Sequence, residues 1–278
     1  MIIEKYSYRN AQKDLPVRRL SDNKTHGGKC LVVAGSKGFF GAAILTCLAS
    51  SRTGAGYTYL KISGLKTSGR FPIDKHPDFL IADNKPDYSI FRAIAIGPGL
   101  VNSTQILSVV KKLIQLKIRN VVLDAGALTS LSKWNKKLPQ TWIITPHEGE
   151  LARILGVSSS IIRKNRQKYA IEAQKKLGCV VLLKGNKTLV VGSKNLTVIQ
   201  SGNPALAKAG TGDVLTGIIL AILAQTSDSA QSAKLGAFVH GFIADQWIKS
   251  GNDVLSLMAS DLIIGLPRAL AKIRNSKR

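Results

Sequence analysis

The stretch of the chain best suited to chemistry is Gly-Thr-Gly-Asp at 210–213, between a loop of small residues and an apolar, helix-like run at 214–224. A glycine-containing turn that leads into a helix leaves several backbone N–H groups free and directed to one point, where they bind a phosphate or a developing oxyanion. The glycines also let a ligand approach the backbone closely. We therefore predict an anion hole formed by Gly210, Thr211 and Gly212.

Asp213 adds a carboxylate to this predicted anion site, where its charge repels an anion unless it serves a purpose. One purpose is general-base catalysis, in which Asp213 takes the proton of a substrate hydroxyl while that oxygen attacks a phosphoryl group. The alternative is that Asp213 only caps the helix, because aspartate is a preferred capping residue. The two roles are compatible, and we predict that Asp213 is the catalytic residue.

Short apolar strands alternate with helices along the chain, which predicts an α/β fold with a mainly parallel central sheet and helices on both faces. Ligands of such sheets bind at the carboxyl ends of the strands. We expect six motifs that follow strands to converge on this edge, which favours an enzyme over a structural module. These motifs are GSKGFFGA at 35–42, GPGL at 97–100, DAGAL at 124–128, TPHEGE at 145–150, KGNKT at 184–188 and GTGD at 210–213.

The elements that position these motifs are predicted from the apolar periodicity. The predicted strands are 30–34, 57–62, 92–96, 120–123, 142–145 and 180–183, followed by a hairpin of 189–191 and 196–199. The predicted helices are 42–53, 104–117, 150–155, a long basic amphipathic helix at 161–177, and then 213–225, 230–249 and 260–274.

The organisation of the chain is simple. Residues 64–90 give no clear pattern, and residues 1–27 are interpreted as a polar N-terminal arm packed on the domain. Because no Pro/Ser-rich or charged linker divides the chain, we predict a single domain over residues 1–278.

The composition argues against several classes of protein. The chain carries 40 Lys and Arg against 16 Asp and Glu, a formal charge of +24, but the basic residues are dispersed and aromatic residues make up only 6%. We therefore expect no dedicated nucleic-acid binding. We expect the positive electrostatic field of the protein to attract small polyanionic ligands. The sequence lacks an apolar run of membrane-spanning length and a signal peptide, so we expect no membrane partner. Three cysteines in apolar surroundings indicate reduced, buried thiols and a cytoplasmic location.

With these motifs in this order, the chain resembles the NAD(P)H-hydrate dehydratase family of the ribokinase-like superfamily, from about residue 28 to about residue 268. The matching motifs are AGS…GAA at 34–43, GPGL at 97–100, LDAGAL at 123–128, TPHEGE at 145–150, KG..T at 184–188 and GN…A..GTGDVL.G at 202–217. GTGD alone marks only the superfamily, whereas the full set is specific. The resemblance implies a ribokinase-like fold and an enzyme that restores the S-form of hydrated NADH and NADPH. ADP or ATP drives the loss of water and yields AMP or ADP with phosphate.

The resemblance also implies roles for individual positions. Contacts to the hydrated nicotinamide nucleotide fall on Ala43, Gly99, His147 and Asp213. Contacts to the adenine nucleotide fall on Lys184, Gly185, Asn186, Lys187, Thr188 and Gly212. Mg²⁺ is expected on the nucleotide phosphates, because Mg²⁺ prefers substrate phosphates to protein cages, so no residue is predicted as a metal ligand. A homotetramer is implied as well.

Two acidic positions and one histidine need a separate interpretation. Many members of the family have Pro after the motif histidine, whereas this chain has Glu148, which could change the stiffness or charge of the loop. His147 alone could be a satisfied loop histidine, but the neighbouring motifs favour a ligand contact. Asp124 is left outside the predicted site as a structural or supporting acid. The remaining histidines form no cluster and are interpreted as structural or surface residues: His26, His76 and His240.

Two other possibilities concern the whole chain. Some relatives carry a fused epimerase domain, and with only 29 residues before the first predicted strand we expect none here. The main alternative function is a small-molecule kinase of the same superfamily that phosphorylates an alcohol such as a thiazole or a pyrimidine. Such a kinase releases a stable phosphorylated product, whereas the dehydratase releases phosphate and NAD(P)H.

Overall fold

The computed structural model of the protein describes residues 1–62 and 76–275. Its strands are β1 Ile2–Tyr6, β2 Lys29–Ala34, β3 Tyr57–Ile62, β4 Leu80–Ile81, β5 Ala93–Ile96, β6 Val121–Leu123, β7 Ile143–Ile144, β8 Val180–Leu183, β9 Leu189–Val191 and β10 Asn195–Ile199. Its α-helices are α1 Tyr8–Asp14, α2 Phe40–Arg52, α3 Ser103–Gln115, α4 Gly126–Ser130, α5 Glu148–Leu155, α6 Ser159–Lys164, α7 Arg166–Leu177, α8 Thr211–Thr226, α9 Ser229–Lys249 and α10 Ala259–Asn275.

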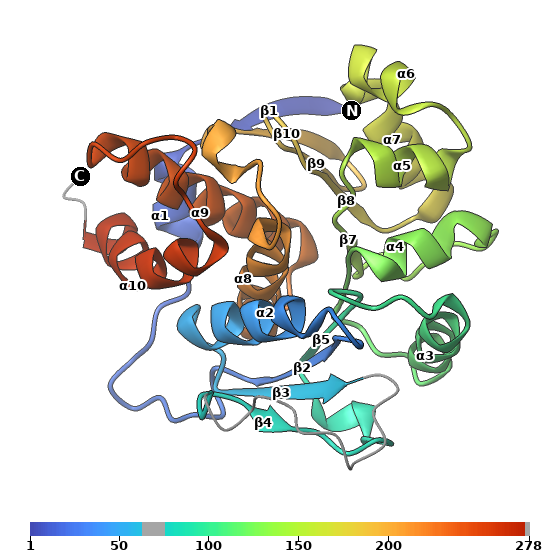
Figure 1. Ribbon diagram of the computed structural model, residues 1–278, viewed down its shortest axis with the longest axis horizontal. Helices are drawn as coiled ribbons and strands as arrows, with labels where there is room; N and C mark the ends of the chain where they lie inside the picture. The colour runs from blue at the N-terminus through green and yellow to red at the C-terminus, as the bar shows by residue number, and fades with distance from the viewer. Residues whose placement is uncertain (63–75, 276–278) are drawn as a thin grey trace.

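These strands form one ten-stranded sheet in the order β1-β10-β9-β8-β7-β6-β5-β2-β3-β4, with helices on both faces (Figure 1). Strand β9 is antiparallel to both of its neighbours, and every other pair is parallel. The predicted α/β class with a mainly parallel central sheet is therefore confirmed.

Side chains that alternate along the strands divide the core into two hydrophobic layers. In β2, Cys30 and Val32 belong to the layer that includes α2, α8, α9 and α10, whereas Leu31 and Val33 belong to the layer that includes α3, α5 and α7. Strands buried on both faces must be continuously apolar, which is why such short hydrophobic runs predict them well. Helix α8 is apolar around most of its circumference and is buried between the sheet, α2 and α9.

The N-terminal segment differs from the polar arm expected for residues 1–27. Ile2–Tyr6 pairs in parallel with β10, with Ile2 opposite Asn195 and Tyr6 opposite Ile199, so it forms an edge of the sheet. Helix α1 then buries Ala11 against the core. The expectation was wrong because an edge strand keeps one face and one edge exposed and needs no long apolar run.

The predicted helix at 161–177 is two helices. The chain breaks at Asn165, which has φ −146° and ψ 63° and accepts a hydrogen bond from the Lys168 amide through its side chain at 3.4 Å. Asparagine is a strong helix-capping residue, and here it starts α7 after ending α6. In the region without a clear pattern, residues 63–75 lie outside the described residues, and the remainder holds β4 and a short 3₁₀ turn at Tyr88–Ile90.

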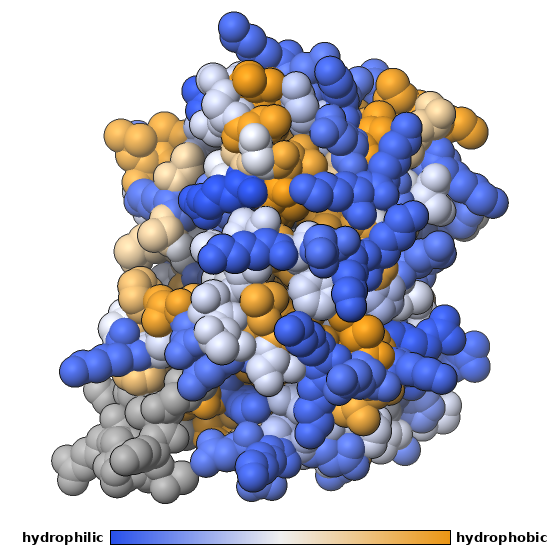
Figure 2. All heavy atoms as spheres, turned by 90° about the vertical axis from the view of Figure 1, so that its right-hand side faces the viewer, coloured by the Kyte–Doolittle hydropathy of each residue, from blue (hydrophilic) through white to orange (hydrophobic). Residues whose placement is uncertain are grey.

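The surface and the cysteines agree with the composition. Hydrophilic side chains cover most of the face shown in Figure 2, with hydrophobic ones scattered among them. Within residues 1–62 and 76–275, no helix combines the length and the apolarity needed to cross a membrane. All three cysteines are free and buried, as predicted, and burial raises the pKa of Cys30 and of Cys179 to about 12.

Candidate active site

The motifs that follow β2, β5, β6, β7 and β8 are joined by backbone hydrogen bonds across the carboxyl edge of the sheet. Gly35 donates to the Pro98 carbonyl at 2.8 Å, and Lys184 donates to the Pro146 carbonyl at 2.8 Å. Gly97 allows the closest approach, because a Cβ there would lie 1.7 Å from the Asp124 carbonyl oxygen. The expected convergence of the strand-end motifs is therefore confirmed.

Lys184 is the central cation of this edge. Its ammonium lies 2.8 Å from Asp124 Oδ1 and 3.8 Å from Glu150 Oε2, with 20% of the side chain exposed. Burial alone would lower the pKa of Lys184, but the charges of Asp124 and Glu150 outweigh burial and raise it. The ammonium therefore stays charged while its two acidic neighbours hold it in place.

Asp124, expected to be a structural or supporting acid, is part of the site because it contacts Lys184. Besides Lys184, its carboxylate accepts a hydrogen bond from Thr216 Oγ1 of helix α8 at 2.8 Å. Burial would raise the pKa of Asp124, yet the charge and hydrogen bond of Lys184 bring it below its ordinary value. The signal available in the sequence was a carboxylate placed directly after β6, the same kind of strand-end position that Lys184 occupies after β8.

Asp213 is the third residue of helix α8, whose N-cap is Gly210 with φ 87°. No hydrogen bond or ion pair of the Asp213 carboxylate is present within the described ranges, and the helix start has no side-chain cap. Capping therefore does not account for this carboxylate. Burial, followed by the negative charge of Asp124, raises the pKa of Asp213 to about 7, against the opposing effect of Lys184.

The start of α8 differs in part from the predicted anion hole of Gly210, Thr211 and Gly212, because the Thr211 amide donates to the Lys208 carbonyl at 3.5 Å. In the part of the chain that the structure describes, the amides of Gly212 and Asp213 have no hydrogen-bond partner, as is usual for the first turn of a helix. A Cβ built on Gly212 would meet only Lys184 Nζ, at 3.5 Å, so the glycine faces the ammonium. The free amides at the start of α8 and the Lys184 ammonium are thus adjacent.

The loop that leads into α8 is held by Thr211 and His240. Thr211 Oγ1 donates to the carbonyls of Leu206 and Lys208, both at 2.8 Å, and His240 Nε2 lies 2.9 Å from the Thr211 carbonyl oxygen. Burial lowers the pKa of His240 to about 4, so the ring is neutral and donates this hydrogen bond. The structural role expected for His240 is confirmed, and it supports the predicted site.

His147 is the N-cap of α5 and forms a reciprocal capping box with Glu150. Its Nδ1 accepts from the amides of Gly149 at 3.0 Å and Glu150 at 3.4 Å, while its own amide donates to Glu150 Oε2 at 2.8 Å. The side chain remains 53% exposed at the rim of the site. The imidazole thus has a structural role, and its exposed part remains free to contact a ligand.

Two predicted substrate positions, Ala43 and Gly99, lie close to the loop after β2. Ala43 is fully buried within α2, so its side chain faces the core and presents no surface to a ligand. Gly99 has φ 64°, and its carbonyl accepts from Ser36 Oγ at 2.6 Å. Beside Gly99, a cavity of about 270 Å³ is lined by Ser36, Lys37, Leu100, Val101, Asn102, Gln105 and Ile106. This cavity lies between the loop after β2 and the segment from β5 to α3.

The predicted nucleotide loop, residues 184–188, joins β8 to β9. Gly185, Asn186 and Lys187 are exposed, and Thr188 Oγ1 donates to the Gly185 carbonyl at 3.2 Å. The loop therefore begins at Lys184, next to the anion hole, and extends outward into solvent.

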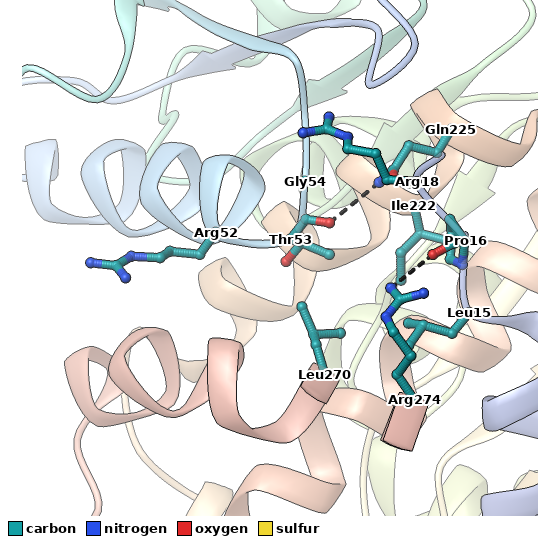
Figure 3. A pocket seen from close by; sticks show the side chains of 10 residues that line it. All are labelled: Leu15, Pro16, Arg18, Arg52, Thr53, Gly54, Ile222, Gln225, Leu270 and Arg274. Carbon is teal, nitrogen blue, oxygen red and sulfur yellow. Dashed lines mark hydrogen bonds between the residues drawn. The ribbon is translucent and has the colours of Figure 1, made fainter. Parts of the chain in front are cut away.

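A second cavity, of about 190 Å³, lies at the opposite edge of the sheet (Figure 3). It is bounded by the ends of α2, α8 and α10, and three arginines contribute to its lining: Arg18, Arg52 and Arg274. Their guanidinium groups do not converge, because Arg52 points away and Arg274 donates to the Pro16 carbonyl at 2.9 Å. This cavity is separate from the strand-end motifs.

This chain is similar to known proteins over most of its length. The family model described as NAD(P)H-hydrate dehydratase matches residues 30–267. The bifunctional NAD(P)H-hydrate repair enzyme of Vibrio cholerae is 38% identical over 90% of this chain, which spans 51% of that protein. The ADP-dependent (S)-NAD(P)H-hydrate dehydratase of Bacillus subtilis is 33% identical over 91% of this chain and 93% of its own length.

Solved structures agree with these sequence relationships. A Bacillus subtilis ADP/ATP-dependent NAD(P)H-hydrate dehydratase, co-crystallised with ATP and Mg²⁺, superposes with a TM-score of 0.88 at 31% identity, covering 98% of this chain and 99% of that one. A ribokinase-like superfamily protein of Enterococcus faecalis, at 23% identity, has a TM-score of 0.85 over 98% of this chain and 96% of its own, and so shares the fold. The chain, which spans about half the length of its bifunctional relatives, belongs to the NAD(P)H-hydrate dehydratase family.

Proposed function

We propose that this protein is an ADP-dependent (S)-NAD(P)H-hydrate dehydratase, which converts hydrated NADH or NADPH to NAD(P)H while ADP is split to AMP and phosphate. The observation that carries the proposal is Asp213, a partly buried carboxylate with a pKa of about 7 beside free helix amides and a lysine. A general base works best when its pKa is near the operating pH. The family relationship supplies the identity of the substrate.

The first step is transfer of the terminal phosphoryl group of the nucleotide to the hydroxyl of the hydrated ring. The hydroxyl oxygen attacks phosphorus, the bond from phosphorus to the nucleotide oxygen breaks, and Asp213 takes the hydroxyl proton. Charge that develops on the phosphoryl oxygens is stabilised by the free amides at the start of α8 and by the Lys184 ammonium. Because Asp213 has no hydrogen bond or ion pair within the described chain, its oxygens are available for the proton.

The second step is loss of phosphate. Hydroxide is a poor leaving group, whereas phosphate leaves readily. The ring nitrogen donates its electron pair to the carbon that loses phosphate, and a proton then leaves the neighbouring carbon to form the nicotinamide double bond. The coproducts are AMP and phosphate from ADP, or ADP and phosphate from ATP.

Mg²⁺ fits this site as a companion of the nucleotide. Across residues 1–62 and 76–275, no group of three or more His, Cys, Asp and Glu side chains could hold a metal ion by itself. Mg²⁺ commonly binds through substrate phosphates with one or two carboxylates. Glu150, whose Oε2 lies 3.8 Å from Lys184 Nζ, is one carboxylate next to the proposed phosphate site, and the ion would neutralise charge on the phosphates.

The test is to mix the protein with ADP, Mg²⁺ and hydrated NADH and to follow the NADH absorbance band. We expect the band to rise only when nucleotide is present, and an arm with ATP gives the nucleotide preference. A protein that consumes nucleotide and phosphorylates a thiazole or pyrimidine alcohol, with no gain of NADH, would be a kinase instead. No gain of absorbance with either nucleotide refutes the proposal.

We also propose a homotetramer and a cytoplasmic location. Exposed apolar side chains before and within α10 support self-association, namely Leu255 (77% exposed), Met258 (56%) and Ile264 (70%). Light scattering on the purified protein measures the assembly directly, and a monomer would contradict the tetramer. Fractionation of cells that express the protein tests its location.

A further inference from the structure

Arg166, the first residue of α7, lies against the loop that joins β8 to β9, where α5 and α7 pack near the sheet (Figure 1). Its guanidinium donates to four backbone carbonyl groups of this loop, those of Leu183 at 3.3 Å, Lys184 at 3.0 Å, Lys187 at 3.4 Å and Asn186. A planar guanidinium with five donors can satisfy several carbonyls at once, which a lysine ammonium on a flexible stem does not reproduce. The solvated basic face expected for residues 161–177 therefore does not describe Arg166.

Glu148 holds the guanidinium in this position. Its Oε1 lies 3.2 Å from Arg166 Nε, and its Oε2 lies 3.3 Å from Arg163 Nε. The Arg166 side chain is only 16% exposed, whereas that of Arg163 is 71% exposed. A charge that is largely removed from water needs a charged partner, and Glu148 provides it. Glu148 is also the residue at which this chain departs from the proline of many family members.

Gly185 shows how closely the guanidinium determines the shape of the loop. It has φ 136°, and a Cβ at this position would lie 2.7 Å from an Arg166 Nη atom. Only glycine accommodates both the backbone conformation and the neighbouring guanidinium. The Lys184 carbonyl is one of the acceptors of Arg166. Arg166 therefore fixes the backbone of Lys184, whose ammonium lies next to the start of α8.

We propose that Arg166, held by Glu148, is a positioning residue that fixes the loop at 184–188 in the conformation that receives the adenine nucleotide. This inference rests on the proposed nucleotide-dependent function. It connects two strand-end motifs, because Glu148 opens α5 after β7 and the loop follows β8. Arg166 acts through the loop backbone and not through the nucleotide.

The experiment compares Arg166→Gln and Arg166→Lys with the matched control Arg163→Gln, which removes the other arginine bound to Glu148. ADP affinity is measured by calorimetry, without the hydrated substrate. We expect Arg166→Gln to weaken ADP binding by at least about tenfold, because several charge-assisted hydrogen bonds to the loop are lost. The ADP affinity of Arg166→Lys should lie between those of Arg166→Gln and the wild type. Arg163→Gln stays within about twofold, since an exposed ion pair contributes little.

Limited trypsin digestion provides a readout that needs no nucleotide. Lys187 is exposed in the loop, and cleavage after Lys187, located by mass spectrometry, is expected to accelerate in Arg166→Gln but not in Arg163→Gln. Thermal melts show whether each variant is folded, and Arg166→Lys decides the question if Arg166→Gln does not fold. Kinetics with the hydrate should show a raised KM for ADP and an unchanged KM for the hydrate, which a general loss of stability does not produce.

Two results overturn the inference: Arg166 variants with wild-type ADP affinity and wild-type cleavage after Lys187, or an equal loss in Arg163→Gln. Failure of the proposed function is a different result. A wild-type protein that binds ADP but forms no NADH refutes the dehydratase activity and leaves the effect of Arg166 on ADP binding to be measured.

Discussion

Replacement of Asp213 by asparagine is the most direct test of the site, because it changes charge and proton affinity with little change in size. As general base, Asp213 contributes roughly 10²–10⁴-fold to the rate, so turnover should fall by at least about 100-fold. ADP binding should persist or tighten, since a carboxylate near the phosphates is removed. In the wild type, kcat/KM should rise through about pH 7, where Asp213 loses its proton.

The same substitution should stabilise the fold at alkaline pH. Asp213 has a pKa of about 7 in the folded protein, against 3.8 for the ordinary side chain, so the folded state holds a proton that the unfolded state has lost. Between pH 3.8 and pH 7 the free energy of unfolding of the wild type falls as pH rises. Above pH 7 it has lost the full contribution of the raised pKa of Asp213. This rise in the pKa of Asp213 corresponds to a loss of about 4 kcal/mol in the free energy of unfolding. We expect about half of that loss, because the side chain is only partly buried.

The assay measures urea unfolding of both proteins at pH 5 and pH 8, with turnover on the same preparations. The free energy of unfolding of Asp213→Asn should exceed that of the wild type by about 2 kcal/mol at pH 8, and by less at pH 5. Asp228→Asn is the matched control: Asp228 caps the neighbouring helix α9 by accepting from the Gln231 amide at 2.9 Å, so turnover should be unaffected. Turnover of Asp213→Asn within about threefold of the wild type would refute the base role. A stability difference independent of pH would refute the electrostatic reasoning.

Three further predictions concern the surroundings of Asp213. Gly212→Val should weaken ADP binding with a cooperative melt retained, because its Cβ meets only the Lys184 ammonium at 3.5 Å and the branches project into the site; calorimetry that shows unchanged affinity would place the nucleotide elsewhere. Asp124→Asn should lower the free energy of urea unfolding by about 3–5 kcal/mol, since it leaves Lys184 without its main partner. It should also move the acid limb of the kcat/KM profile to lower pH than in the wild type, because the charge of Asp124 raises the pKa of Asp213. The buried Cys30 and Cys179 should react with a thiol reagent only after unfolding, and fast reaction of the native protein would contradict their burial.

The central strands could be predicted from sequence because each is a short apolar run, buried on both faces and followed by glycine or a polar motif. The strand β1 could not, because its Ile2 and Ile3 are exposed and its partner lies in residues 195–199. Pairing over such a distance leaves no local pattern. The break at Asn165 was missed for a different reason: the basic residues on both sides favour helix, and the cap that divides them is a single side chain.

In the candidate site, too, features with a local sequence pattern could be predicted, and features that depend on distant contacts could not. Its location at the carboxyl edge followed from the order of strands and motifs, and Lys184 and Gly212 are indeed adjacent. The role of Asp124 did not follow, because its partner is 60 residues away along the chain. Arg166 was hidden in a helix whose composition predicts a solvated face, and only the tertiary contact with the 184–188 loop reveals its burial.

The pairing of β1 with β10 has a consequence for synthesis of the chain on the ribosome. Strand β1 is made before its partner Asn195–Ile199, so about 190 further residues must follow it before the two can pair. At about 5–20 residues per second, this interval lasts roughly 10–40 s. During it, the strand that contains Ile2 and Ile3 has no partner on its β10 side. The pairing of β1 with β10 is therefore a late step in forming the sheet, and a bulky tag joined just before β1 would act on that step.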